Sequence, residues 1–177
     1  MTKAEFSKIS AVLKVSFSWA KLFETDAAIE VWYRKLSDIP FPVMAAVVDK
    51  WIETKNNPPT IADLRTEAAN TINGETPIWT DGWQQVRKAI SRYGAYRKEE
   101  ALASMDELTA KTVSLLGWQQ ICESENTDVV RANFRMTYET LAKRKEIDLA
   151  LSPDTKQRIE SAKVGALVAG VAKELTA

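Results

Sequence analysis

Apolar residues recur every three or four positions along most of this chain, and no segment shows the apolar–polar alternation of a β-strand. A repeat of three to four residues places side chains on one face of an α-helix, whereas a strand requires a repeat of two. Four such stripes occupy the first part of the chain: Phe6, Ile9, Leu13 and Phe17; Ile29, Trp32, Tyr33 and Leu36; Met44, Val47, Val48 and Trp51; and Ile61, Leu64, Ala68 and Ile72. We therefore predict an all-α protein.

Signals for helix ends agree with these stripes. Thr2 with Glu5, and Thr60 with Asp63, have the spacing of capping boxes at helix starts. Further along, Asp106 and Gly117 bracket a predicted helix over 107–116, and Thr127 is predicted to cap a long helix that ends near Ala150. Ser152-Pro153-Asp154 predicts the start of a last helix, which ends near Leu175.

The stripes and end signals divide the chain into four parts. Residues 1–74 are predicted to form a small four-helix bundle, 75–81 a linker, 82–150 a second helical region, and 151–177 a long C-terminal helix. The last helix has an apolar side that two glycines interrupt, and glycine within a helix costs about 0.5–1 kcal/mol relative to alanine. Two readings stay open for it: the helix orders on a partner, or it docks on the protein's own core.

Composition excludes several classes of function. The 24 basic residues equal the 24 acidic residues in number, which disfavours a strongly basic nucleic-acid binder. The chain contains no histidine and one cysteine, Cys122, so histidine bases, mixed Cys/His zinc sites and disulfide frameworks are excluded. No glycine is followed by lysine, so the chain has no P-loop. We predict no metal, no cofactor and no enzymatic activity, with a carboxylate enzyme at Glu99 and Glu100 as a distant alternative.

The ends of the chain carry no membrane signal. The first residues lack the apolar region of a signal peptide. The longest apolar run, 164–172, is much shorter than the ~20 residues of a membrane span. A cytoplasmic protein with no membrane partner is the expectation.

Several residues remain as candidates for a partner-binding surface. Trp19, Trp79 and Trp118 fall outside the stripes, and tryptophan is enriched in protein–protein hot spots. The 127–149 helix carries Arg131, Arg135, Lys143 and Arg144, although Glu139 and Glu146 dilute this charge, so direct nucleic-acid binding is predicted to be weak or absent.

Three motif groups carry a family resemblance. The first is Trp32 to Asp38 (W-x-x-x-L-x-D) followed by Pro58 to Leu64 (P-P-T-I-A-D-L), and the second is Trp83 to Gly94 (W-x-x-V-x-x-A-I-x-x-Y-G). The third runs from Gly117-Trp118 through Ser124-Glu125-Asn126 to Tyr138-Glu139. In order and spacing these motifs, over about residues 25–145, resemble the phage replicative-helicase loader/inhibitor family of small bacteriophage replication proteins.

This resemblance implies an all-helical adaptor without its own ATPase. Such a protein binds the hexameric replicative DNA helicase, inhibits it, and helps load it at an origin where an initiator is bound. Seven residues are predicted to contact the partner: Trp118, Arg131, Arg135, Lys143, Arg144, Leu167 and Val171. The alternative is a small helical DNA-binding or packaging accessory protein, with DNA against the 127–149 helix or a helix-turn-helix near 42–72.

Overall fold

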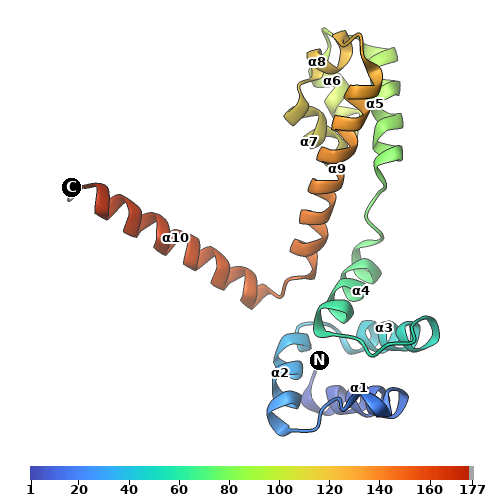
Figure 1. Cartoon of the computed structure of the whole chain (residues 1–177), viewed down its shortest axis with the longest axis vertical. Coiled ribbons are helices and arrows are strands. Elements are labelled where there is room, and N and C mark those ends of the chain that lie inside the picture. The colour runs from blue at the N-terminus through green and yellow to red at the C-terminus, as the bar shows by residue number, and fades with distance from the viewer. Residues whose placement is uncertain (176–177) are drawn as a thin grey trace. The chain divides into compact units, whose positions relative to one another are not determined.

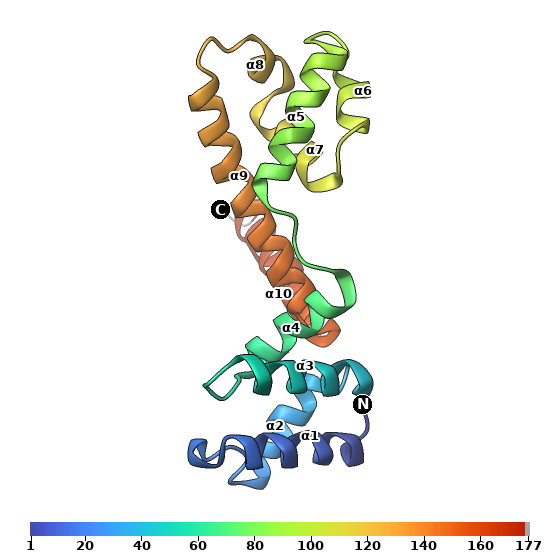
Figure 2. The ribbon, with the colours of Figure 1, turned by 90° about the vertical axis from the view of Figure 1, so that its right-hand side faces the viewer.

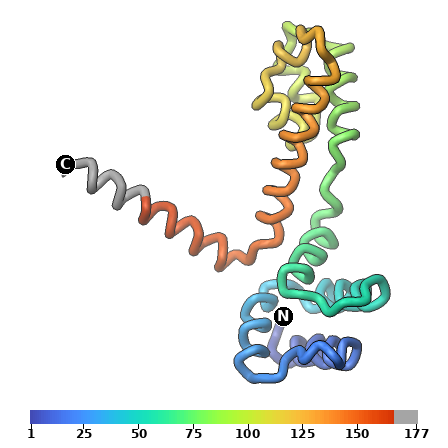
Figure 3. The backbone as a smooth tube through the Cα atoms, viewed as in Figure 1, coloured from blue at the N-terminus to red at the C-terminus, as the bar shows by residue number. Residues whose placement is uncertain are grey.

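The computed structural model describes the backbone of residues 1–175 and the side chains of residues 1–166 (Figure 3). Helices make up 78% of the structure, and the described residues contain no strand, so the all-α prediction is confirmed. Among the described residues, no helix combines the length and apolar character that crossing a membrane requires.

By their contacts, Met1–Gly74 and Leu149–Ala177 form one compact unit, which we call unit 1. Its elements are α1 (Lys3–Ser16), the short 3-10 helix η1 (Ser18–Ala20), α2 (Asp26–Leu36), α3 (Phe41–Thr54), α4 (Ile61–Asn73) and α10 (Pro153–Leu175). Figures 1 and 2 both show α1 and α3 running side by side, with α2 crossing between their ends.

The predicted stripes supply most of the core of unit 1. All four residues of the first stripe are at most 4% exposed, and all four of the third are at most 8% exposed. Two predicted core residues are exposed instead: Ile29 at 36% and Ile72 at 57%. Ile29 lies in the first turn of α2 and Ile72 in the last turn of α4, and periodicity marks a face of a helix without marking how much of its length other elements cover.

Both predicted capping boxes are present. The Thr2 hydroxyl accepts from the Glu5 amide at 3.2 Å, and the Glu5 carboxylate accepts from the Thr2 amide at 2.7 Å. Thr60 and Asp63 make the same pair of bonds at 3.2 and 2.8 Å. These bonds satisfy amides that the first turn of a helix leaves without partners.

Glu75–Asp148 forms a second compact unit, which we call unit 2. It contains α5 (Trp79–Tyr93), α6 (Lys98–Ala103), α7 (Glu107–Leu116), α8 (Trp118–Glu123) and most of α9 (Thr127–Ala150). Its core is separate from that of unit 1 and includes the fully buried Val86, Val113 and Phe134.

Two predicted boundaries in this region are wrong by a few residues. The predicted linker 75–81 is shorter in the structure, because α5 already begins at Trp79. The residue that caps α9 is Asn126 rather than Thr127: the Asn126 side-chain oxygen accepts from the Val129 amide at 3.2 Å, and Thr127 is already helical. Asparagine and threonine are both common caps, so the sequence alone did not separate them.

The predicted start of the C-terminal helix is confirmed. α10 begins at Pro153, and the Ser152 hydroxyl accepts from the Thr155 amide at 3.3 Å. Its first residues group with unit 1 because the side chain of Arg65, on α4, donates to the Ala150 carbonyl, and Lys35 donates to the Thr155 hydroxyl at 3.4 Å.

Candidate partner-binding surface

Trp79 lies beside two arginines in unit 2. The guanidinium carbons of Arg131 and Arg135 are 5.3 and 5.4 Å from the centroid of the Trp79 ring. Both distances are within the range of cation–π attraction, which is strongest for tryptophan. The structure therefore joins three residues that the sequence analysis considered separately into what we call the Trp–Arg cluster.

The Trp–Arg cluster is positively charged and accessible. Arg135 forms an ion pair with Glu139 at 2.8 Å, and both side chains are about half exposed. A guanidinium stays protonated at any physiological pH and binds carboxylates or phosphates through two parallel hydrogen bonds. The cluster thus offers a partner an anion-binding group beside an aromatic ring.

Packing between α5 and α9 fixes the cluster's position. One helical turn after Trp79, Trp83 packs on Phe134 with ring centroids 5.3 Å apart, and Phe134 packs on Tyr138 at 5.5 Å. Gly82 permits this close approach, because a Cβ atom there would lie 2.7 Å from a ring carbon of Tyr138.

Lys143 and Arg144 do not join the cluster. At about 3.6 residues per turn, Lys143 points roughly a third of a turn away from Arg131 around α9, and Arg144 roughly two fifths of a turn away in the other direction. Both are exposed, and Lys143 forms an ion pair with Glu146 at 2.9 Å. The four predicted basic residues of α9 therefore do not form one continuous face.

The prediction that Trp118 lies on the surface is wrong. Its side chain is 1% exposed, and its indole N–H donates to the Gly94 carbonyl at 3.1 Å. Gly117, with φ of 88°, turns the chain between α7 and α8 and directs the next residue into the core of unit 2. Trp118 is thus a core residue of the folded unit.

α10 offers a second surface. Every residue from 157 to 166 is exposed, including the apolar Ile159 and Val164. The side chains of Leu167 and Val171 lie outside the described residues, so these two predicted contacts remain predictions.

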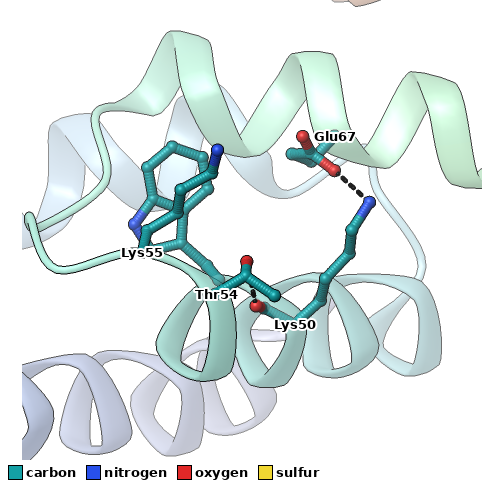
Figure 4. Close-up of a pocket in the computed structure, with 5 residues that line it drawn as sticks. Lys50, Thr54, Lys55 and Glu67 are labelled. Carbon is teal, nitrogen blue, oxygen red and sulfur yellow. Dashed lines mark hydrogen bonds and ion pairs between the residues drawn. The ribbon is translucent and has the colours of Figure 1, made fainter.

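Unit 1 has a small hollow between α3 and α4, of about 260 Å³ (Figure 4). Its polar groups bond to one another: Lys50 pairs with Glu67 at 2.8 Å, and the Thr54 hydroxyl donates to the Lys50 carbonyl at 2.7 Å. Lys55 lies over the Trp51 ring at 5.8 Å. The hollow thus presents groups that already bind one another.

The groups considered for catalysis have structural surroundings. Glu100 forms an ion pair with Arg97 at 3.0 Å, and the hydrogen bond from Arg97 lowers the pKa of its carboxyl. Burial, with the nearby Glu123, raises the pKa of the Cys122 thiol, which disfavours the reactive thiolate. Among the described residues, no three side chains of metal-binding types gather around one point.

Comparison with known proteins identifies the N-terminal part of the chain. Residues 1–65 match the family model of the N-terminal domain of the phage gene 39 protein. Over these 65 of its 177 residues, the chain is similar to a gene 39 N-terminal domain. The phage gene 39 protein is a helicase inhibitor and loader, so the predicted family resemblance is confirmed for this part. No curated protein and no solved structure matches the chain.

The matched residues 1–65 comprise α1, η1, α2, α3 and the first turn of α4. Their W-x-x-x-L-x-D motif has a structural role that the sequence did not indicate, because Asp38 binds Arg65 through two hydrogen bonds of 2.8 and 2.9 Å. Arg65 also donates to the Lys35 carbonyl at 2.6 Å and to the Ala150 carbonyl. A single guanidinium thus binds carbonyls at the ends of α2 and α9, where helix dipoles favour a positive charge.

The predicted contact residues all lie outside the matched residues 1–65. Arg131, Arg135, Lys143 and Arg144 lie on α9, and Leu167 and Val171 on α10. The family match therefore covers none of the residues that were predicted to contact the partner.

Proposed function

We propose that this protein is a phage DNA-replication adaptor that binds the hexameric replicative DNA helicase, inhibits it, and helps load it at an origin. The observation that carries this proposal is the gene 39 N-terminal domain over residues 1–65. The absence of a Gly-Lys pair agrees with an adaptor that has no ATPase of its own.

Two surfaces are suited to the helicase contact. The Trp–Arg cluster combines tryptophan and arginine, the residue types most enriched in binding hot spots. α10 presents exposed positions from 157 to 166, and its apolar pattern continues in sequence through Leu167 and Val171. An amphipathic helix of this kind binds partners by placing its apolar side in a groove.

Inhibition would follow from selective binding. If the adaptor binds one conformational state of the helicase more tightly than the others, binding shifts the population toward that state. The helicase then stops unwinding until the adaptor leaves, and no chemistry by the adaptor is required.

Size-exclusion chromatography with multi-angle light scattering tests the proposal, using the full chain and the host's replicative helicase with and without ATP. We expect a complex that survives the column under at least one condition. The absence of any complex under both conditions would contradict the proposed function.

Matched variants test the surfaces within that assay. Replacing Arg131 and Arg135 together with alanine should weaken helicase binding about 10-fold or more, as loss of hot-spot residues does. The control replaces two exposed lysines of the same unit, Lys98 and Lys111, with alanine. It removes the same charge and should leave helicase binding unchanged. The double variant Leu167→Glu with Val171→Glu tests α10, because it replaces two apolar residues with carboxylates and should weaken helicase binding if α10 makes the contact. If all variants bind like the native chain, the complex uses another surface.

An arginine pair beside a tryptophan also fits single-stranded DNA, whose phosphates bind arginine and whose bases stack on aromatic rings. Gel shifts of the isolated protein at low and high salt distinguish this alternative. Tight binding to DNA that the Arg131/Arg135 variant loses would favour the DNA-binding accessory over the helicase adaptor.

A further inference from the structure

The side of α5 that faces away from its core carries a shallow hollow of about 400 Å³. The hollow is lined by Gln84, Arg87, Lys88 and Ser91. These positions have the spacing i, i+3, i+4 and i+7, so they share one face of the helix, and all four side chains are exposed. The buried Val86 and Ala89 lie on the opposite side of α5. The lining of the hollow is therefore entirely polar or basic.

The cations of this face are available to an incoming anion. Among the described residues, Arg87, Lys88 and Arg92 form no ion pair with a carboxylate. Arg92 is also exposed and lies four residues after Lys88, which places it next to Lys88 on the helix surface. An anion can pair with these three groups without displacing a carboxylate of the protein.

Arg92 also belongs to an aromatic–arginine group at the end of α5. The guanidinium carbons of Arg92 and Arg97 are 5.4 and 5.2 Å from the centroid of the Tyr93 ring, within the range of cation–π attraction. In the turn between Tyr93 and Arg97, Tyr96 is 96% exposed, so its ring is open to a ligand. We call Arg87, Lys88, Arg92 and Tyr96 the basic strip.

Carboxylates limit the basic strip at both ends. Asp81 lies on α5 about two turns before Lys88. On α6, which packs beside α5 (Figure 2), Glu100 forms an ion pair with Arg97 at 3.0 Å, and Glu99 is exposed next to it. Arg97 is thus partly neutralised, and the three remaining cations suit a short segment of about three phosphates.

The hydrophilic hollow and the open aromatic ring favour a single nucleic-acid strand over an acidic protein. The centre of a protein–protein contact is apolar and depleted in charge, and the hollow has no apolar lining residue. A single strand needs cations for its phosphates and exposed aromatic rings on which its bases stack. In a duplex the bases already stack on one another, so Tyr96 would contribute little to binding it.

We propose that the basic strip binds single-stranded DNA, with Arg87, Lys88 and Arg92 on its phosphates and Tyr96 stacked on a base. The choice of DNA over RNA rests on the proposed function in DNA replication. The strip lies on α5 and the turn after it, and it shares no residue with the Trp–Arg cluster or α10. An adaptor with this site could hold a DNA strand while other surfaces hold the helicase.

Fluorescence anisotropy tests the site, using the full chain and a labelled oligothymidine of about 12 nucleotides, within the usual site sizes of single-strand binding. We expect weak binding, with a Kd of about 10⁻⁴ to 10⁻⁶ M at physiological salt. Neutralising about three phosphates of a single strand gives a salt slope of about −2, so affinity should fall about 20-fold between about 50 and 200 mM salt.

Variants then separate the charged and aromatic contributions. Arg87→Gln with Lys88→Gln should weaken binding about 10-fold or more and reduce the salt slope by about 1.4. Tyr96→Ala should weaken binding about 5-fold or more without changing the salt slope, because it removes stacking alone. The matched control, Lys111→Gln with Lys145→Gln, removes the same charge from exposed positions of the same unit and should leave the affinity unchanged.

Competitors and the second arginine pair provide the outcomes that would overturn the proposal. Polyglutamate or duplex DNA that displaces the strand as well as unlabelled oligothymidine does would assign the strip to an acidic protein or to duplex DNA. An oligouridine that binds more tightly would assign it to RNA. Loss of binding in the Arg131/Arg135 variant, but not in the Arg87/Lys88 variant, would assign the DNA to the Trp–Arg cluster. The helicase complex is measured without DNA, so its failure and the failure of this site are distinguishable.

Discussion

Gly82 lies within α5 and faces side chains of both α7 and α9. A Cβ atom at this position would lie 2.7 Å from the Tyr138 ring, 2.8 Å from the Thr109 hydroxyl and 3.3 Å from the Phe134 ring. Helix propensity alone predicts that Gly82→Ala stabilises the protein. We expect the opposite, a loss of about 1–3 kcal/mol in the free energy of unfolding, because overpacking a tight core forces neighbours to shift. Urea denaturation measures this change.

Gly165 on α10 is the matched control for that substitution. A Cβ atom there would have nothing within 4 Å. Gly165→Ala should therefore increase the helicity seen by circular dichroism, since alanine is favoured over glycine in a helix by about 1 kcal/mol. If Gly82→Ala stabilised the protein, as Gly165→Ala is expected to stabilise its helix, the packing around position 82 would not require a glycine.

The Asp38–Arg65 pair should make the stability of unit 1 depend on pH. Burial alone would raise the pKa of Asp38, but the hydrogen bonds and charge of Arg65 outweigh it and hold that pKa below its ordinary value. A lowered folded-state pKa stabilises the unit fully above the unfolded carboxyl's pKa, and this contribution is lost as pH falls through the folded-state pKa. Asp38→Asn should remove this acid-side dependence, which urea denaturation at a series of pH values measures.

Arg65→Ala removes the other partner of the Asp38–Arg65 pair. It removes bonds to a carboxylate and to two carbonyls, so we expect a loss of about 2–3 kcal/mol in unit 1 and faster hydrogen exchange where α10 begins. Arg34→Ala, an exposed arginine on α2, is the control. Unchanged exchange around residues 151–156 would show that Arg65 does not hold the start of α10.

At the scale of single elements, the capping box of α4 gives a prediction of its own. Thr60→Ala removes the hydroxyl that accepts from the Asp63 amide, and such a loss costs about 1 kcal/mol. Thr60→Ser retains the hydroxyl and should be nearly neutral. Hydrogen exchange in the first turn of α4 measures both; equal protection in the two variants would contradict a role for the cap.

Helices could be predicted from this sequence because their signals are local. The Thr60–Asp63 box and the stripe through Met44 and Trp51 each depend on residues within a few turns of one another, and the structure has both. Ile72, in the last turn of α4, fits the stripe and is nevertheless 57% exposed, since a periodic pattern does not indicate where along the helix burial ends.

The candidate surface was harder to predict because it depends on contacts between distant elements. Trp79 and Arg131 are far apart in sequence, and no local pattern indicates that α5 and α9 bring them within 5.3 Å. Trp118 was predicted to be exposed because it fits neither neighbouring stripe, yet the turn at Gly117 buries it. The apolar repeat of one helix does not continue across a turn into the next helix, so the repeat does not predict whether a residue at such a turn is buried.

At the scale of the whole molecule, the residues that the structure describes form two separate hydrophobic cores. Phe6, Leu36 and Leu64 belong to the core of unit 1, and Val86, Val113 and Phe134 to that of unit 2. Each core is built from residues of its own unit, so a cavity in one removes contacts from that unit alone. The two units should therefore have free energies of unfolding that vary independently.

Leu64→Ala and Leu108→Ala test this independence as a pair. Both leucines are nearly fully buried, Leu64 in unit 1 and Leu108 in unit 2, and each substitution should cost about 2–5 kcal/mol. Hydrogen exchange followed by mass spectrometry reports both units in one experiment. Leu64→Ala should speed exchange in α1 and α3 while α5 and α7 keep their native rates, and Leu108→Ala should do the reverse. Because α9 is a single helix that begins in unit 2 and ends with Leu149 and Ala150 of unit 1, its exchange is the decisive signal. If either substitution speeds exchange along all of α9 and in both cores, the two units unfold together, and a partner that binds one of them would stabilise the other.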